Sequence, residues 1–304
     1  MQIADPKKFT FSGHDSFQCR LLWLKKGFDF LQKGHSFNDA DAPVLLGVGN
    51  NMVRSIRYWL RAFGLLEEDL ETPTSLAESI FSDDNGFDPF LEDQATLWLL
   101  HYKLIKTHYA STYWLIFNEL RKRKIEFMKE DFVNYVILKS QQEKFSANPG
   151  TVGDDFVVFI KMYLQAGKQL KDKDDSVAGI LNELNLIRTM ERLTDDEKKT
   201  VPIHTIPLSE REDLPAVLLL LCLLETPGVG LSVSLETLEN DPDMPCSIFA
   251  MNRTGLLRKI EELTIRFPTM ITYSDQAGVR ELQFKEKPIH PLQLLKEIYV
   301  EAEV

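Results

Sequence analysis

Residues 46–66 read LGVGNNMVRSIRYWLRAFGLL, and this stretch decides how the rest of the chain is interpreted. Gly47 and Gly49 interrupt any preceding helix, and Gly64 suits a helix end, because glycine readily adopts the left-handed backbone conformation found there. Between these glycines the apolar side chains recur with the 3.6-residue period of an α-helix. The pattern predicts a helix over Asn50–Phe63.

The predicted helix has two faces of opposite character. At about 100° per residue, one face collects only apolar side chains, and the other is polar, basic and free of carboxylates. Asparagine can pair with adenine, and arginine with guanine or phosphate, so this division suits a helix that enters the major groove of DNA. An ordinary amphipathic surface helix is the alternative. The polar face consists of Asn50, Asn51, Arg54, Ser55, Arg57, Tyr58 and Arg61.

Shorter patterns around this helix complete a helix-turn-helix. We expect a strand at Phe9–Phe11, a helix over Ser16–Phe30 and a short helix over Ala40–Leu46, and we expect Leu65–Leu70 to be extended. A DNA-binding helix-turn-helix places its second helix in the groove. Residues 1–80 are therefore predicted to form a winged-helix DNA-binding domain.

The segment before the predicted helix carries further functional side chains. Lys25 and Lys26 suit contacts to DNA phosphates. His14 and Arg20 form a candidate anion site, and with Asp15 they form a candidate acid/base site. The alternative is structural, with Ser12 or Asp15 capping the helix while His14 and Arg20 hold it against the wing.

Residues 81–210 are predicted to form a helical middle domain. Two extended pieces, Leu186–Arg192 and Val201–Ile206, flank the acidic turn Thr194–Lys199 and are candidates for a β-hairpin. The predicted helices of this region are Glu92–Leu104, Ser111–Lys122, Lys129–Ser140, Thr151–Gln165 and Ser176–Leu184.

Residues 211–304 repeat the element order of a winged helix. Helices are expected over Leu214–Glu225, Leu235–Asn240 and Asn252–Arg266, followed by strands at Met270–Tyr273 and Val279–Phe284. The whole chain is thus expected to be mainly α with small β-wings, with a winged helix at each end.

Composition excludes several classes of protein. The 304 residues are 44% hydrophobic and 27% charged, as in a globular chain rather than a disordered one. The most apolar run, residues 214–224, is too short to cross a membrane, and three widely spaced cysteines argue for a reducing cytoplasm. The net charge of −11 is unevenly distributed, because residues 1–66 hold nine Lys/Arg against five Asp. A basic head on an acidic body is compatible with one DNA-facing module.

Other chemistries have weaker support in the sequence. Gly47-Val48-Gly49 lacks the lysine or third glycine that a phosphate loop needs. His101 and His108 lie seven positions apart without a glutamate partner, which is not a zinc-protease pattern. We therefore expect no catalytic residue, no cofactor and no metal.

Three stretches resemble a bacterial family known as domain of unknown function 4007. They are GHDSFQCRLLWLKKGFDF (13–30), GVGNNMVRSIRYWLRAFGL (47–65) and GFDPFLEDQATLWLLHY (86–102). Genes of this family often lie beside genes for sulfurtransferases similar to phosphoadenosine phosphosulfate reductases, in DNA phosphorothioation or phage-defence clusters. The resemblance implies a DNA-binding partner of such a modification enzyme.

The leading hypothesis is a non-catalytic protein that holds double-stranded DNA for a sulfurtransferase-like partner in the cytoplasm. One alternative is a transcriptional regulator that dimerises through its carboxyl-terminal segment. The other is an enzyme or nucleotide-binding protein that uses His14, Asp15 and Arg20.

Overall fold

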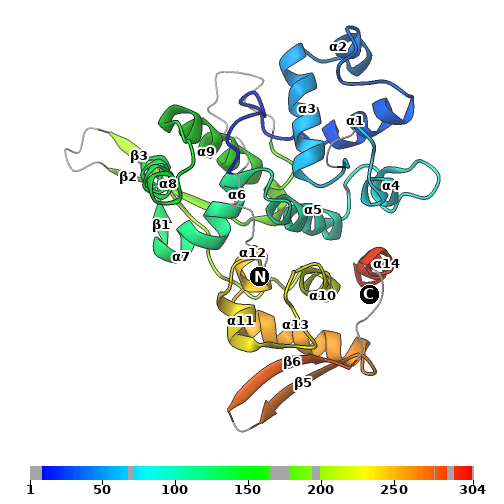
Figure 1. Cartoon of the computed structure of the whole chain (residues 1–304), viewed down its shortest axis with the longest axis vertical. Coiled ribbons are helices and arrows are strands. Elements are labelled where there is room, and N and C mark those ends of the chain that lie inside the picture. The colour runs from blue at the N-terminus through cyan, green and yellow to red at the C-terminus, as the bar shows by residue number, and fades with distance from the viewer. Residues whose placement is uncertain are drawn as a thin grey trace.

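A computed structural model describes residues 9–67, 71–164, 178–193, 199–276, 278–285 and 291–302. Helices dominate this part of the chain, and the strands form two three-stranded antiparallel sheets (Figure 1). The expected composition of the fold, mainly helical with a small β content, is confirmed.

The amino-terminal region contains four helices: α1 (Trp23–Gln32), α2 (Ala42–Leu46), α3 (Asn50–Ala62) and α4 (Ser75–Phe81). Helices α2 and α3 lie close to their predicted positions, whereas α4 was not predicted. The prediction of a helix from Ser16 is wrong, because α1 begins only at Trp23. Asp15 and Ser16 have left-handed φ angles of 45° and 65°, which no right-handed helix accommodates.

The expected strand at Phe9–Phe11 does not form, because these three residues have no regular structure. Phe9 and Phe11 instead pack against Phe145, with ring centroids 4.6 Å and 6.4 Å away. After α3, an isolated bridge between Leu66 and Pro73 is the only strand-like pairing among the described residues of this region, and part of the predicted segment Leu65–Leu70 lies outside them. The described amino-terminal helices therefore have no sheet of their own.

The middle region is helical, as predicted, with one irregular turn. The segment Ser111–Lys122, predicted as a single helix, contains a π-helical turn at Ile116–Leu120. Beside this turn, Asn118 donates to the Trp114 carbonyl and accepts from the Asp243 backbone N–H, at 3.2 Å and 2.8 Å. The elements are α5 (Gln94–Lys106), α6 (Ser111–Leu115), η1 (Ile116–Leu120), α7 (Arg121–Arg123), α8 (Lys129–Glu143), α9 (Pro149–Tyr163) and η2 (Asn182–Leu184).

The predicted helix Ser176–Leu184 is wrong over its described residues, of which only Asn182–Leu184 form a single 3₁₀ turn. Gly179 shows the reason. A Cβ atom at this position would lie 2.4 Å from the Cα atom of Met162, so the chain here crosses closely over α9. Tertiary packing replaces the local helical preference.

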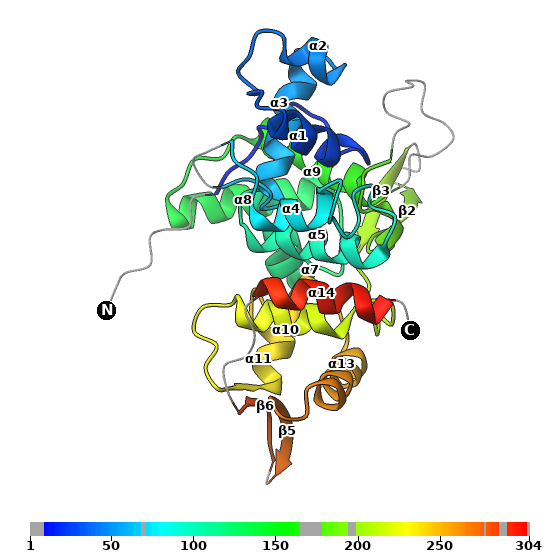
Figure 2. The same cartoon turned by 90° about the vertical axis from the view of Figure 1, so that its right-hand side faces the viewer.

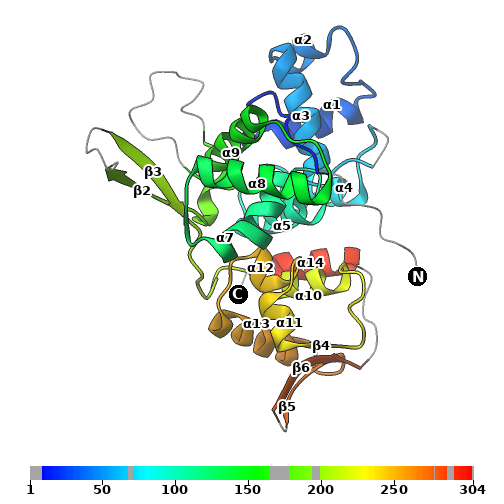
Figure 3. The same cartoon turned by 60° about the vertical axis from the view of Figure 1, so that its left-hand side comes forward.

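The first sheet contains the predicted hairpin. Strands β2 (Arg188–Leu193) and β3 (Thr200–Thr205) pair antiparallel, and β1 (Glu126–Phe127) joins the other edge of β3. The pair projects from the body of the molecule (Figures 1 and 3). Most of the acidic turn Thr194–Lys199 lies outside the described residues.

The carboxyl-terminal region contains helices and a second sheet with the strand order β4-β6-β5. Strand β5 pairs antiparallel with β6, so that Ile271 faces Phe284. The helices predicted from residues 214, 235 and 252 are all present within two residues of those positions. The elements are α10 (Ala216–Leu224), β4 (Ser232–Ser234), α11 (Leu235–Asn240), α12 (Pro245–Ile248), α13 (Arg253–Arg266), β5 (Ile271–Gln276), β6 (Val279–Phe284) and α14 (Pro291–Ala302).

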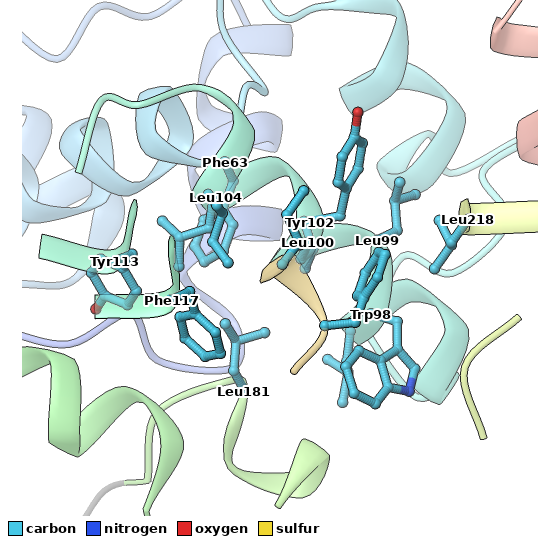
Figure 4. Close-up of a cluster of buried hydrophobic side chains, with 14 of the residues drawn as sticks. Phe63, Trp98, Leu99, Leu100, Tyr102, Leu104, Tyr113, Phe117, Leu181 and Leu218 are labelled. Atoms are coloured by element: carbon cyan, nitrogen blue, oxygen red, sulfur yellow. The ribbon is translucent and has the colours of Figure 1, made fainter. Parts of the chain in front are cut away.

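Helix α5 connects the regions. It is apolar on nearly every side, and in Figure 4 its side chains meet Phe63 at the end of α3, Phe117 of η1 and Leu218 of α10. In Figure 2, α5 lies between the amino-terminal helices and the layer formed by α10 and α14. The buried hydrophobic side chains form one continuous cluster from Cys19 to Ile298.

The three cysteines are buried and carry free thiols. Among the described residues, none of the helices combines the length and apolar composition that crossing a membrane requires.

Candidate nucleic-acid interface

Helix α3 begins at one end of the molecule. The first turns of α3, together with α2, project beyond the other helices (Figures 1 and 3). Gly49 precedes it in an extended conformation, and Gly64, with a φ of 68°, closes it while Leu65 N–H donates to the Leu60 carbonyl at 2.8 Å. The apolar face is buried as predicted. The exposed or partly exposed polar side chains of α3 are those of Asn50, Asn51, Arg54, Arg57 and Arg61.

Two residues predicted for the outer face lie inside. Ser55 is fully buried, and its hydroxyl donates to the carbonyl of His14 at 2.8 Å. Tyr58 is 5% exposed, and its ring contacts those of His14 and Tyr109 at centroid distances of 5.4 Å and 5.2 Å. The prediction that both side chains face outward is wrong, because the loop at Ser12 to Ser16 covers this side of α3.

Arg54 is the most outward-facing arginine of α3 and is held in place. Its side chain is 60% exposed. The Nε atom donates to Oδ2 of Asp15 at 2.7 Å, and the Nη2 atom donates to Oδ1 of Asn51 at 2.8 Å. The guanidinium therefore has one edge bound to the protein and another directed away from these partners.

Arg57 and Arg61 are more enclosed. The Nε atom of Arg57 lies 2.9 Å from Oε1 of Glu71, and its Nη1 atom donates to Oδ1 of Asn38 at 3.2 Å. The Nε atom of Arg61 is buried without a hydrogen-bond partner in the part of the chain that the structure describes. Sequence reasoning missed Asp15 as a partner of Arg54 and Glu71 as a partner of Arg57, because both carboxylates come from outside the helix.

The loop before α1 fixes the buried side of α3. His14 is 4% exposed, and its Nε2 atom lies 3.0 Å from Oδ1 of Asp155, an equally buried residue of α9. The same carboxylate accepts from the backbone N–H of Ser12 and from the Thr112 hydroxyl, at 2.9 Å and 3.3 Å. Gly13 adopts a φ of 101°, and a Cβ atom there would lie 2.8 Å from the Tyr58 ring. The close approach of the loop to α3 therefore favours glycine at this position.

His14 and Arg20, the candidate anion site, have different surroundings. His14 stacks on the indole of Trp59 at a centroid distance of 5.8 Å, inside the protein. Arg20 lies with its guanidinium carbon 5.1 Å from the ring centroid of Trp23 and 5.7 Å from that of Phe17. Both side chains therefore contact protein groups, but neither part of the structural alternative is seen in the described residues: Leu22 stands at the N-cap of α1 without a side-chain cap, and no wing sheet lies beside the helix.

The two lysines of α1 also differ. Lys25 is buried, and its Nζ atom donates to Asp29 and Asp83, both at 2.6 Å. Burial disfavours the charged form of Lys25 and acts to lower its pKa. The interactions with Asp29 and Asp83 outweigh this effect of burial, and the pKa of Lys25 is raised. The positive charge of its ammonium is therefore balanced by two carboxylates within the protein. The expected phosphate contact is not available to it.

Lys26 remains exposed, with its Nζ atom donating to the Leu46 carbonyl at 3.2 Å. It lines a cavity of about 210 Å³ between α1 and α2, together with Lys33 and His35. Lys33 and His35 were missed by sequence reasoning because they lie in a turn without helical periodicity. They join Lys26 at the cavity, whose lining also includes the Asp29 carboxylate bound by Lys25, so that basic side chains outnumber acidic ones and suit an anion.

Fold and site together define a predominantly helical protein that presents one outward-facing helix rich in asparagine and arginine. The chain belongs to the DUF4007 family of proteins of unknown function, whose match covers residues 11–299.

Two solved structures share this fold. A crystal structure of magnesium-ion-bound SspB is 24% identical with a TM-score of 0.81, and a second SspB crystal structure is 25% identical with a TM-score of 0.80. Each comparison covers 97% of this chain and 89% of the SspB chain. A search of curated proteins found no match. Within the described residues of the present chain, no group of three or more His, Cys, Asp or Glu is arranged to hold a metal ion.

Proposed function

We propose that this protein is a non-catalytic, DNA-binding component of a bacterial DNA-modification or phage-defence complex of the phosphorothioation type. The observation that carries the proposal is the outer face of α3, where Asn50, Asn51 and Arg54 are exposed and no residue of the helix is acidic. Such a face can contact phosphates and base edges. The Lys26 cavity adds a second place for a backbone phosphate.

The finer layout is a helix-turn-helix at the amino terminus and a winged-helix-like domain at the carboxyl terminus. The succession α10, β4, α11, α12, α13, β5, β6 and the strand order β4-β6-β5 support the second assignment. Three packed helices, α1 to α3, support the first, without a wing sheet in the described residues.

The carboxyl-terminal domain is proposed to bind protein rather than DNA. Helix α13 occupies the place of a DNA-reading helix, but its exposed arginines are paired with carboxylates. Arg253 Nε lies 3.1 Å from Glu239, and Arg258 lies 2.9 Å and 3.0 Å from Glu210 and Glu212. Beyond residue 66 the chain holds 26 Lys/Arg against 41 Asp/Glu, an acidic surface that repels DNA. The partner proposed from the family resemblance is a sulfurtransferase-like modification enzyme.

Duplex binding tests the proposal with a matched pair of variants. Arg54→Ala with Arg61→Ala should weaken retention of DNA, with a salt slope smaller by about two, because two cationic contacts are removed. Arg253→Ala with Arg258→Ala removes the same charge from α13 and should leave DNA binding unchanged. Equal behaviour of the two double variants in fluorescence anisotropy would contradict the assignment to α3.

Isolation of the native complex tests the partner. A tagged chain should retain a sulfurtransferase-like enzyme after nuclease treatment, because the contact is between proteins. A contact that disappears with the DNA would contradict this part of the proposal.

A further inference from the structure

The guanidinium of Arg54 has two edges with different uses. The side edge is formed by Nε–H and one Nη2–H, and it is occupied by Asp15 and Asn51 at 2.7 Å and 2.8 Å. The end edge is formed by Nη1–H and the other Nη2–H. Within the described residues no hydrogen bond engages Nη1, and the side chain is 60% exposed. Two parallel donors therefore point away from the protein.

The two acceptors that orient Arg54 are themselves fixed. Asn51 lies one turn earlier on the same helix. Asp15 belongs to the loop that His14 and Ser12 anchor to Asp155, and its left-handed φ of 45° sets the direction of its side chain. A long side chain that is already held in place loses less conformational entropy when it binds a partner.

A fixed end edge matches guanine in the major groove, where O6 and N7 accept two parallel hydrogen bonds. We propose that Arg54, oriented by Asp15 and Asn51, recognises a guanine in this way and gives the protein a sequence preference. The inference rests on the proposed function, because it requires α3 to enter the groove. Asp15 is then a positioning residue, although it is an acid at a DNA-binding surface.

The opposite role for Asp15 is to mask Arg54 from DNA, and the two roles predict opposite results. As a positioning residue, Asp15 maintains selectivity, so Asp15→Ala should lower the preference for guanine. As a mask, Asp15 competes with phosphate, so Asp15→Ala should strengthen binding to every duplex equally.

Selection of bound duplexes from a randomised library, followed by sequencing, measures the preference directly. The wild-type chain should enrich guanine at one position of its site, and Arg54→Lys should reduce that preference by roughly fivefold to hundredfold, because lysine cannot form the paired contact. Asp15→Ala and Asp15→Asn should reduce it in the same direction. Arg253→Lys on α13 is the matched control and should leave it unchanged.

Three results would overturn the inference. Tighter binding by Asp15→Ala with an unchanged preference would show masking. DNA binding that depends on Arg54 without any guanine preference would refute base recognition and leave the proposed function intact. A wild-type chain that binds no duplex would refute both. Because Arg54 is exposed, Arg54→Lys tests the idea even where the Asp15 variants are destabilised, which thermal unfolding would reveal.

Discussion

The Nε2 atom of His14 lies 3.0 Å from Oδ1 of Asp155, although 141 positions separate the two residues in the chain. This contact ties the loop before α1 to α9, and the same loop covers Ser55 and Tyr58 of α3. The orientation of the proposed DNA-binding helix is therefore set partly by a residue far outside the first 80 positions.

Replacing His14 with alanine should lower the free energy of unfolding by about 2–4 kcal/mol. The change leaves a buried carboxylate short of a partner and opens a cavity beside Trp59. Denaturant titration of the folded chain measures the loss. Arg280→Ala, which breaks the exposed pair of Arg280 with Asp275, is the control and should cost less than about 1 kcal/mol. Similar losses in the two variants would argue against a special role for His14.

Gly13 and Gly34 form a second matched pair. Both have a left-handed φ, of 101° and 81°, but a Cβ atom at Gly13 meets the Tyr58 ring at 2.8 Å, whereas nothing lies within 4 Å at Gly34. Gly34→Ala should cost about 1 kcal/mol from backbone strain alone. Gly13→Ala should cost at least about 1 kcal/mol more, since the ring must also move. Equal decreases of the melting temperature in Gly13→Ala and Gly34→Ala would show that the Tyr58 ring moves aside without an energetic penalty.

Stability should fall in mild acid because of His101. Burial lowers its pKa to about 3, despite the opposing hydrogen bond to the Ile248 carbonyl. The unfolded chain binds this proton near pH 6.5, so between those values it holds more protons than the folded state. The free energy of unfolding therefore decreases as pH falls, by up to about 1.4 kcal/mol per pH unit from this residue.

The variant His101→Gln isolates that contribution. It keeps hydrogen-bonding groups near Tyr163 and Ile248 but cannot titrate. Urea midpoints at pH 7 and pH 5 should differ less in the variant than in the wild-type chain. Parallel pH dependence in both would mean that other groups cause the acid sensitivity.

Lys26 and Lys33 should contribute to DNA binding through phosphate. Their simultaneous replacement by alanine removes two cations from the cavity between α1 and α2, so the salt slope should decrease by about two. Lys144→Ala with Lys296→Ala removes the same charge from exposed positions on other elements and serves as the control. If both double variants show the same slope, the cavity has no specific role.

Local periodicity was sufficient to predict most helices. Helix α3 begins at the expected residue, and the pairs β2–β3 and β5–β6 form where turns separate extended segments. The failures lie where distant contacts decide the backbone. The left-handed residues at Ser12 to Ser16 follow from contacts with Asp155 and Tyr58, and the turn at Gly179 follows from its approach to Met162.

The candidate site was predictable in part for the same reason. A helical wheel distinguishes the apolar face of α3 from the polar one, and it placed Asn50, Asn51 and Arg54 correctly on the exposed side. It could not show that a loop covers Ser55 and Tyr58, or that Asp83, from outside α1, joins Asp29 in binding Lys25. Contacts made by other segments do not change the hydrophobic periodicity of the helix they contact, so that periodicity does not predict them.

The central position of helix α5 in the core has a consequence for how the family can evolve. Because its side chains belong to the same core as Phe63 of the amino-terminal region and Leu218 of the carboxyl-terminal region, neither end has an independent interior. Many DNA-binding modules spread by recombination as self-contained cassettes. This chain cannot exchange its first 80 residues without a donor that also matches α5, so we expect the family to diversify by point substitution on exposed faces and to inherit its three regions as a single unit.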